Sequence, residues 1–158
     1  MKALKNSWIV VVLIAVLCSC GDTPLYNKSY SFKNNAWEQN VKPVFQVPVP
    51  DTTDFYTIQI TIRTTTDYAF NNLWFFIHSK TPQGQTGREP VEMKIANPDG
   101  SWIGEASGTI VENTVYFRHR KFPQKGNYTF TFEQGITEKT ASNVMDISFA
   151  VIRDPNQK

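Results

Sequence analysis

Short runs of alternating apolar and polar residues dominate this chain and leave few folds open to it. The clearest run covers residues 56–63, where Tyr56, Ile58, Ile60 and Ile62 fall on one side and polar residues on the other. A period of two is the geometry of a β-strand with one buried face and one solvated face. The run therefore predicts a strand in a sheet that covers a core.

Other segments carry related patterns. Residues 73–78 are apolar on both sides, which predicts a strand in the middle of a sheet, covered on both faces or covered on one while exposing aromatic residues on the other. We expect Trp74 to lie in the core. Residues 45–49 alternate but include Pro48, which confines them to an edge or a strand end. The remaining predicted strands are 91–95, 114–118, 127–133 and 144–152, with a turn at 97–100.

Roughly seven to nine short strands with regularly spaced turns are typical of an antiparallel sandwich or barrel. The prediction is an all-β sandwich, of jelly-roll or Ig-like type, with little helix. We expect a single domain over residues 29–154 and a short tail at 155–158. Stability has to come from packing, for which the chain offers 11 Phe, 6 Tyr and 4 Trp.

The N-terminus has the layout of a secretory signal. Lys2 and Lys5 precede the apolar run 8–17, which is too short to span a bilayer as a permanent helix. The segment Leu-Cys-Ser-Cys at 17–20 resembles the bacterial lipobox, with Cys20 as the lipidated residue. Residues 1–19 are then a cleaved signal peptide, and residues 20–28 are the lipidated cysteine and a tether.

Two or more acyl chains on Cys20 would hold the protein stably on a membrane. Gly21 follows the cysteine, whereas the best-known signal for retention in the inner membrane is an Asp at that position, so an outer-membrane location is favoured. The alternative is an ordinary secretory signal cut nearby, with Cys18 and Cys20 incidental.

The charge balance bears on the partners. The full chain carries a formal charge of +2, and removal of residues 1–19 takes away Lys2 and Lys5 and leaves zero. Nucleic-acid binding depends on a strong positive surface. Nucleic acid is therefore not an expected partner.

No pattern in the sequence points to catalysis. The two histidines, His78 and His119, lack the spacing of a metal site, and His78 is interpreted as a strand residue on the solvent side. No serine elbow occurs, and the acids are scattered, so that nothing marks a glycosidase pair. We expect no enzyme activity, no metal and no cofactor.

Four residues are candidates for a binding surface. Arg118 and Arg120 belong to an Arg-His-Arg-Lys run that could contact lipid headgroups or an acidic protein, although a solvated strand end is the more common explanation. Trp37 and Trp102 could line a binding face, since indoles stack on sugar rings, or could pack in the core.

Several motifs in order resemble one family, the gliding-motility lipoprotein GldH. They begin with the lipobox at Cys20 and the run at 56–63, and they continue through Asp-Tyr at 67–68, Asn-Leu-Trp at 72–74, Pro-Asp-Gly-Ser-Trp-Ile-Gly at 98–104, Phe-Pro at 122–123, Gly-Asn-Tyr at 126–128 and Phe-Glu-Gln-Gly at 132–135. The resemblance implies an envelope lipoprotein of a gliding or associated secretion machine, without assigned catalytic residues.

Two functions follow from this reading. The first is a non-catalytic lipoprotein that binds other envelope proteins, which predicts a flat or convex apolar face. The second is a lipid-anchored carbohydrate-binding module or weak glycan-processing enzyme, which needs exposed coplanar Trp or Tyr residues beside a groove with two acids.

Overall fold

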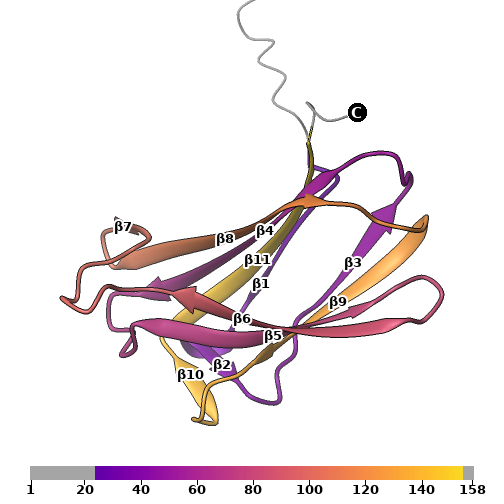
Figure 1. The fold of residues 1–158 in the computed structure, drawn as a ribbon. Helices are drawn as coiled ribbons and strands as arrows, with labels where there is room; N and C mark the ends of the chain where they lie inside the picture. The colour runs from indigo at the N-terminus through magenta and orange to yellow at the C-terminus, as the bar shows by residue number, and fades with distance from the viewer. Residues whose placement is uncertain (1–23, 155–158) are drawn as a thin grey trace, which may run out of the picture.

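A computed structural model of the chain describes residues 24–154 and shows two antiparallel sheets packed face to face, with a two-stranded ribbon at one end (Figure 1). The expected signal peptide, Cys20 and the tail at 155–158 lie outside the described residues. No helix within residues 24–154 is both long enough and apolar enough to cross a membrane. The elements are β1 (Tyr26–Ser31), the 3-10 helix η1 (Lys33–Asn35), β2 (Ala36–Glu38), β3 (Val44–Val49), β4 (Tyr56–Thr65), β5 (Asn72–Lys80), β6 (Thr86–Lys94), β7 (Glu105–Ser107), β8 (Ile110–Arg120), β9 (Gly126–Gln134), β10 (Thr140–Ser142) and β11 (Val144–Arg153).

The strand order is that of a jelly roll. One sheet runs β1-β11-β4-β8-β7, the other runs β3-β9-β5-β6, and β2 pairs with β10 in the ribbon. Among the eight longer strands the first pairs with the last, the second with the seventh, the third with the sixth and the fourth with the fifth. This nested pairing, wrapped into two sheets, is the jelly-roll topology. The predicted antiparallel sandwich is confirmed, in its jelly-roll form.

The structure has more strands than the sequence predicts. β2, β7 and β10 contain three residues each, which is too short for alternation to be visible in the sequence. β1 is a polar edge strand, and it begins at Tyr26. Residues 26–28, which we expected in the tether, therefore belong to the sheet, because they pair in register with the apolar strand β11.

The strongest sequence patterns match the sheets. β4 lies at the centre of the five-stranded sheet, with Ile60 and Ile62 fully buried. β3 is an edge strand, as Pro48 requires, and β5 lies inside its sheet. The turn at 97–100 forms with the Gly100 N–H donating to the Asn97 carbonyl at 2.9 Å, and Gly100 has a φ of +85° that favours glycine.

The placement of Trp74 is different from our expectation. Leu73 and Phe75 on β5 are fully buried, but Trp74 between them is 41% exposed. Neighbouring strand residues point to opposite faces, and the outer face of the four-stranded sheet is open to solvent at this position. β5 is therefore covered on one face only, which is the second of the two arrangements that its apolar pattern allows.

Aromatic rings fill the space between the two sheets. Phe149 on β11 packs against Phe45, Phe130 and Phe132 of the facing sheet, with ring centroids 5.0–5.5 Å apart. Such tilted and edge-to-face pairs add to the free energy gained by burying the rings. The strands predicted at 127–133 and 144–152 are confirmed as β9 and β11.

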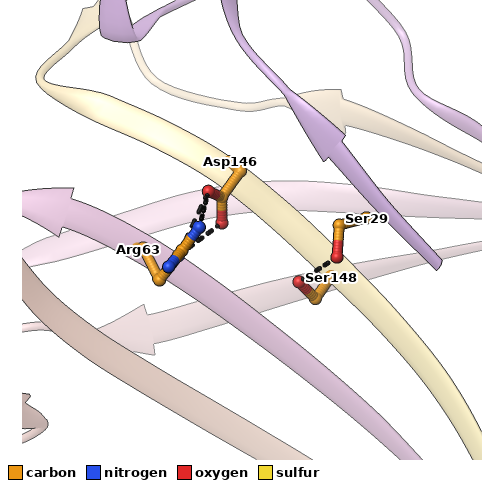
Figure 2. A network of polar contacts seen from close by, with 4 residues as sticks. All are labelled: Ser29, Arg63, Asp146 and Ser148. Atoms are coloured by element: carbon orange, nitrogen blue, oxygen red, sulfur yellow. Dashed lines mark hydrogen bonds and ion pairs between the residues drawn. The ribbon is translucent and has the colours of Figure 1, made fainter. Parts of the chain in front are cut away.

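The outer face of the five-stranded sheet is polar instead. Figure 2 shows two cross-strand contacts on it, the ion pair of Arg63 with Asp146 and the hydrogen bond between the Ser29 and Ser148 hydroxyls at 2.7 Å. The outer face of the five-stranded sheet is therefore mostly polar, with Tyr116 as an exposed aromatic residue, whereas that of the four-stranded sheet carries the exposed Trp74.

Candidate functional site

The chain enters the sandwich at the end where several strands terminate, which we call the anchor end. Tyr26, the first residue of β1, pairs with Val151 near the end of β11, and Tyr56 at the start of β4 pairs with both Arg153 and Arg120. Figure 1 shows the start of β1 and the end of β11 together, away from the ribbon of β2 and β10. Loops at this end therefore lie near the start of β1, where the described part of the chain enters the domain.

A pocket of about 390 Å³ lies between the two sheets at the anchor end. We call it the anchor-end pocket. Its walls are mostly apolar and come from both sheets and from the loop after β8, and they include Ile58, Ile77, Phe117, Phe122, Tyr128 and Phe130. Four exposed charged side chains also line it, namely Arg88, Glu89, Arg120 and Lys121. This volume is within the range of small-molecule sites in proteins.

A β-bulge directs Arg120 toward this pocket. Ile58 pairs with Phe117, but Tyr56 pairs with Arg120, so two residues of β8 face the single residue Thr57 of β4. The extra residue is accommodated by His119, whose φ of +59° is left-handed and unusual for a non-glycine residue. In a regular strand Arg120 would lie on the face opposite to Phe117. The bulge instead places both residues on the pocket side.

The neighbours of Arg120 are held against aromatic rings. The His119 ring stacks on Phe55 with centroids 4.1 Å apart, and the Lys121 Nζ lies 5.3 Å from the centroid of the same ring. Arg118 points to the other side of the strand, over Tyr116. The basic run is therefore an exposed strand end, as expected, and it divides into Arg118 outside the pocket and Arg120 with Lys121 at the pocket.

Basic and acidic residues are unevenly distributed between the two ends of the domain, although the described residues have no net charge. The anchor end carries seven basic residues against four acids, and the rest of residues 24–154 carries six basic residues against nine acids. A neutral domain with one basic end has a preferred orientation at a negatively charged surface. The basic residues of the anchor end are Lys80, Arg88, Arg118, Arg120, Lys121, Lys125 and Arg153, and the acids are Asp51, Asp54, Glu89 and Asp154.

A second surface feature lies on the outer face of the four-stranded sheet. We call it the β5 strip and define it as Trp74, Phe76 and His78 of β5 with Arg88 of the neighbouring β6. The Arg88 guanidinium lies 3.5 Å from the centre of the Phe76 ring, a cation–π distance. Trp74, Phe76 and His78 point the same way because they are spaced by two along the strand. The strip is a row of aromatic and basic side chains in which Trp74 and Arg88 are exposed and Phe76 and His78 are half-buried.

Glu133 on the adjacent strand β9 joins this strip to a polar cluster. Its carboxylate lies 2.7 Å from His78 Nε2 and 3.3 Å from Lys42 Nζ. Partial burial alone raises the pKa of Glu133, but the hydrogen bonds from His78 and Lys42 and the charge of Lys42 outweigh it and hold that pKa below its usual range. His78 lies on the solvent side, as expected, in an ion-pair cluster. No three His, Cys, Asp or Glu side chains within residues 24–154 gather as a metal site would need.

The structure separates the four candidate surface residues. Trp37 is fully buried, stacks on Phe32 with centroids 4.8 Å apart and donates from Nε1 to the Val41 carbonyl, so its assignment to a binding surface is wrong. The physical reason is that the ribbon of β2 and β10, to which Trp37 belongs, closes one end of the core and turns this side chain inward. Trp102 is half-buried and packs against the core at the end opposite the anchor end. Arg118 and Arg120 are both exposed, but they lie on opposite sides of β8.

The β5 strip and the bulge were not found from the sequence. Phe76 and Arg88 lie in different strands, and only the pairing of β5 with β6 brings them into contact. The apolar pattern on both faces of β5 is the signal that could have revealed the exposed aromatic residues. A strand with this pattern is either covered on both faces or covered on one face with its other aromatic residues exposed to solvent. No signal in the sequence marks the bulge, because His119 is not a residue type reserved for left-handed conformations.

Comparison with known proteins connects this geometry to one family. The family model described as GldH lipoprotein matches residues 24–151. The gliding motility lipoprotein GldH of Flavobacterium johnsoniae is 29% identical, over 94% of this chain and 96% of the relative. The gliding motility lipoprotein GldH homolog of Christiangramia forsetii is 23% identical, over 99% of this chain and all of the relative.

Solved structures give only distant likenesses. Eiger TNF from S. frugiperda has a TM-score of 0.37 at 8% identity, covering 86% of this chain and 99% of that one. Latent PorU from Porphyromonas gingivalis has a TM-score of 0.34 at 11% identity, covering 87% of this chain and 14% of that one. These values carry no argument about function. The family assignment rests on the sequence matches, which extend from the first described strand to the last, and by them the chain belongs to the GldH lipoprotein family, whose members are lipid-anchored in the cell envelope.

Proposed function

We propose that this chain is a non-catalytic component of the gliding apparatus that binds another envelope protein through the β5 strip. The observation that carries the proposal is Trp74, which is 41% exposed on an inner strand of the four-stranded sheet and lies in line with the Phe76–Arg88 pair. Tryptophan and arginine are enriched among the residues that dominate binding energy at protein interfaces. An exposed row of them is therefore a candidate docking surface.

The surroundings of the strip suit a protein partner. Val44 on the edge strand of the same sheet is also exposed, and the cluster of His78, Glu133 and Lys42 places polar groups beside the aromatic ones. Protein interfaces combine a core of this kind with a polar rim. The strip runs along the side of the sandwich from Trp74 and reaches the anchor end only at Arg88, so a partner standing on the same membrane can reach it.

The second candidate function, sugar binding, is favoured by the exposed indole of Trp74 and by two acids on the neighbouring strands, since Glu92 lies opposite Trp74 and Glu133 opposite Phe76. A glycan-processing site also needs two acids at a groove. Glu92 and Glu133 are instead bonded to Asn72 and to His78 and Lys42, and neither of them lines the anchor-end pocket, whose single acid is Glu89. We therefore favour protein binding. We further propose that Cys20 carries the lipid after removal of residues 1–19 and that the location is the outer membrane, since Gly21 follows the cysteine.

The decisive experiment replaces single residues in a gliding host that depends on this chain. We expect Trp74→Ala to reduce gliding at an unchanged protein level and Tyr116→Ala to leave it unchanged. Tyr116 is the matched control because it is an exposed aromatic residue, 48% accessible, on the outer face of the other sheet. A photo-crosslinking residue at position 74 is expected to capture one defined envelope protein, whereas the same residue at position 116 is not.

Three results would contradict the proposal. Normal gliding of the Trp74→Ala strain would exclude the β5 strip as the docking surface. Retention of the protein on envelope glycans, lost in Trp74→Ala, would favour the carbohydrate-binding function. Full function of a soluble Cys20→Ala variant would show that the anchor is dispensable.

A further inference from the structure

We propose that the anchor-end pocket binds the acyl chain of an anionic lipid, with the negatively charged head held by Arg120 and Lys121. This inference does not depend on the proposed docking function, because the pocket and the β5 strip lie on different surfaces and share only Arg88. Three features of the pocket carry it, namely its walls, its charged side chains and its position.

The walls fit a hydrocarbon chain. Phe117, Phe122 and Phe130 line the pocket together with Ile58 and Ile77, and these side chains have no hydrogen-bonding groups. An apolar surface left open to water costs free energy in proportion to its area, roughly 25 cal/mol per Å². A ligand with an apolar chain removes that cost, and a sugar or a nucleotide does not.

The charged residues at the pocket fit an anion. Arg120 and Lys121 line it against one acid, Glu89, which leaves an excess of one positive charge, while the Arg88 guanidinium lies over Phe76 on the outer face of the sheet. Arg120 reaches the pocket only because of the bulge at His119, where the backbone adopts a left-handed φ. Backbone strain and bulges of this kind are concentrated at functional sites, where they re-aim a side chain. The bulge therefore places a cation beside an apolar chamber.

The position fits a lipid as the source. Five residues, 21–25, separate Cys20 from the first residue of β1, which limits the distance between the lipidated residue and the domain to about 20 Å. The anchor end is also the basic end of the described domain, so the field of an anionic membrane favours the orientation that turns the pocket toward the bilayer. The pocket is then held where lipids are at high local concentration.

The test uses the full lipoprotein reconstituted in phosphatidylcholine vesicles. Each sample contains one photoreactive probe, either a palmitate analogue, phosphatidylglycerol or phosphatidylcholine, with the same diazirine near the end of the acyl chain. After illumination, mass spectrometry locates the labelled residues. We expect labels on Phe117, Phe122 or Phe130 from at least one anionic probe, and about tenfold less from phosphatidylcholine, since a charge-assisted contact is lost.

The two anionic probes separate the sources of the ligand. Labelling by palmitate alone identifies a free fatty acid, and labelling by phosphatidylglycerol alone identifies a membrane phospholipid. Labels confined to residues outside the pocket, or equal labelling by phosphatidylcholine, would overturn the proposal.

Matched variants test separately the charge of Arg120 and the open volume of the pocket. We expect Arg120→Gln to lower pocket labelling about tenfold, while Arg118→Gln, one position before the bulge and outside the pocket, leaves it unchanged. Ser79→Trp should fill the pocket and abolish labelling, with circular dichroism checking that the protein stays folded. If that variant unfolds, competition by unlabelled palmitate or phosphatidylglycerol in the wild type replaces it. Failure of competition, or equal labelling of the two arginine variants, would contradict the site.

Discussion

Arg63 on β4 and Asp146 on β11 lie directly opposite each other and form a two-pronged ion pair, with Nε 3.0 Å from Oδ1 and Nη2 bonded to Oδ2 (Figure 2). The Asp146 side chain is only 5% exposed, whereas that of Arg63 is 43% exposed. The carboxylate is therefore the buried partner, and it depends on the guanidinium for its hydrogen bonds. β11 has a bulge immediately before this position, between Val144 and Asp146.

We predict that Arg63→Met lowers the free energy of unfolding at pH 7 by about 2 kcal/mol, because it leaves the Asp146 carboxylate buried without a charged partner. Arg63→Lys should cost nearly as much, since an ammonium cannot form both bonds at once. Urea unfolding of the purified proteins measures both. The exposed Arg118→Met is the control, with an expected change within about 0.5 kcal/mol. An unchanged midpoint for Arg63→Met would show that the pair is energetically neutral.

The cluster around Glu133 predicts a pH-dependent contribution to stability. The pKa of Glu133 is depressed in the folded protein by its bonds to His78 and Lys42. Its ionised form therefore stabilises the fold above the unfolded value of about 4.3, and that stabilisation disappears as the pH falls through the lower folded value.

Glu133→Gln should accordingly reduce the free energy of unfolding relative to wild type at pH 6–7, and the difference should shrink toward about pH 3. Urea unfolding at several pH values measures it. Lys42→Met removes one of the two partners of Glu133. In that background, Glu133→Gln is expected to cause a smaller pH-dependent difference in the free energy of unfolding. If the difference in the free energy of unfolding between wild type and Glu133→Gln were as large at about pH 3 as at pH 6–7, the ionised carboxylate would not be its cause.

The contrast between two tryptophans gives a third prediction. Trp37→Ala removes a fully buried ring and its hydrogen bond to Val41, and we expect it to destabilise the domain by about 3–5 kcal/mol. Trp74→Ala removes an exposed ring and should cost less than about 1 kcal/mol. Thermal unfolding of both variants measures this. If Trp74→Ala were as destabilising as Trp37→Ala, its effect on gliding would reflect folding and not docking.

The bulge in β8 gives a fourth prediction. His119→Val favours a regular strand, because a β-branched residue rarely adopts the positive φ of this bulge. Without the bulge Arg120, three residues after Phe117, turns to the opposite face, so the photoreactive anionic lipid should no longer label the pocket. His119→Asn tolerates a positive φ, so labelling should be retained. Equal labelling in the Val and Asn variants, both confirmed as folded by circular dichroism, would show that the bulge does not position Arg120.

The sequence by itself determined those features of the fold whose signal lies within a few consecutive residues. The strands at 56–63, 127–133 and 144–152 follow from alternation, the edge position of β3 follows from Pro48, and the turn at 97–100 follows from its proline and glycine. Each of these signals depends on the covalent geometry of a few consecutive residues, which no distant contact has to supply. The family motifs and the lipobox are local in the same sense.

Only the tertiary structure decided which apolar residues are covered and where the charges meet. Trp37 and Trp74 are the same residue type in strands, yet one is buried by the ribbon of β2 and β10 while the other faces solvent. Arg63 and Asp146 meet although 83 residues separate them, and Arg120 lines the pocket because one extra residue in β8 changes its face. Burial and pairing depend on what the remote parts of the chain place alongside, and that information is absent from any short window of sequence.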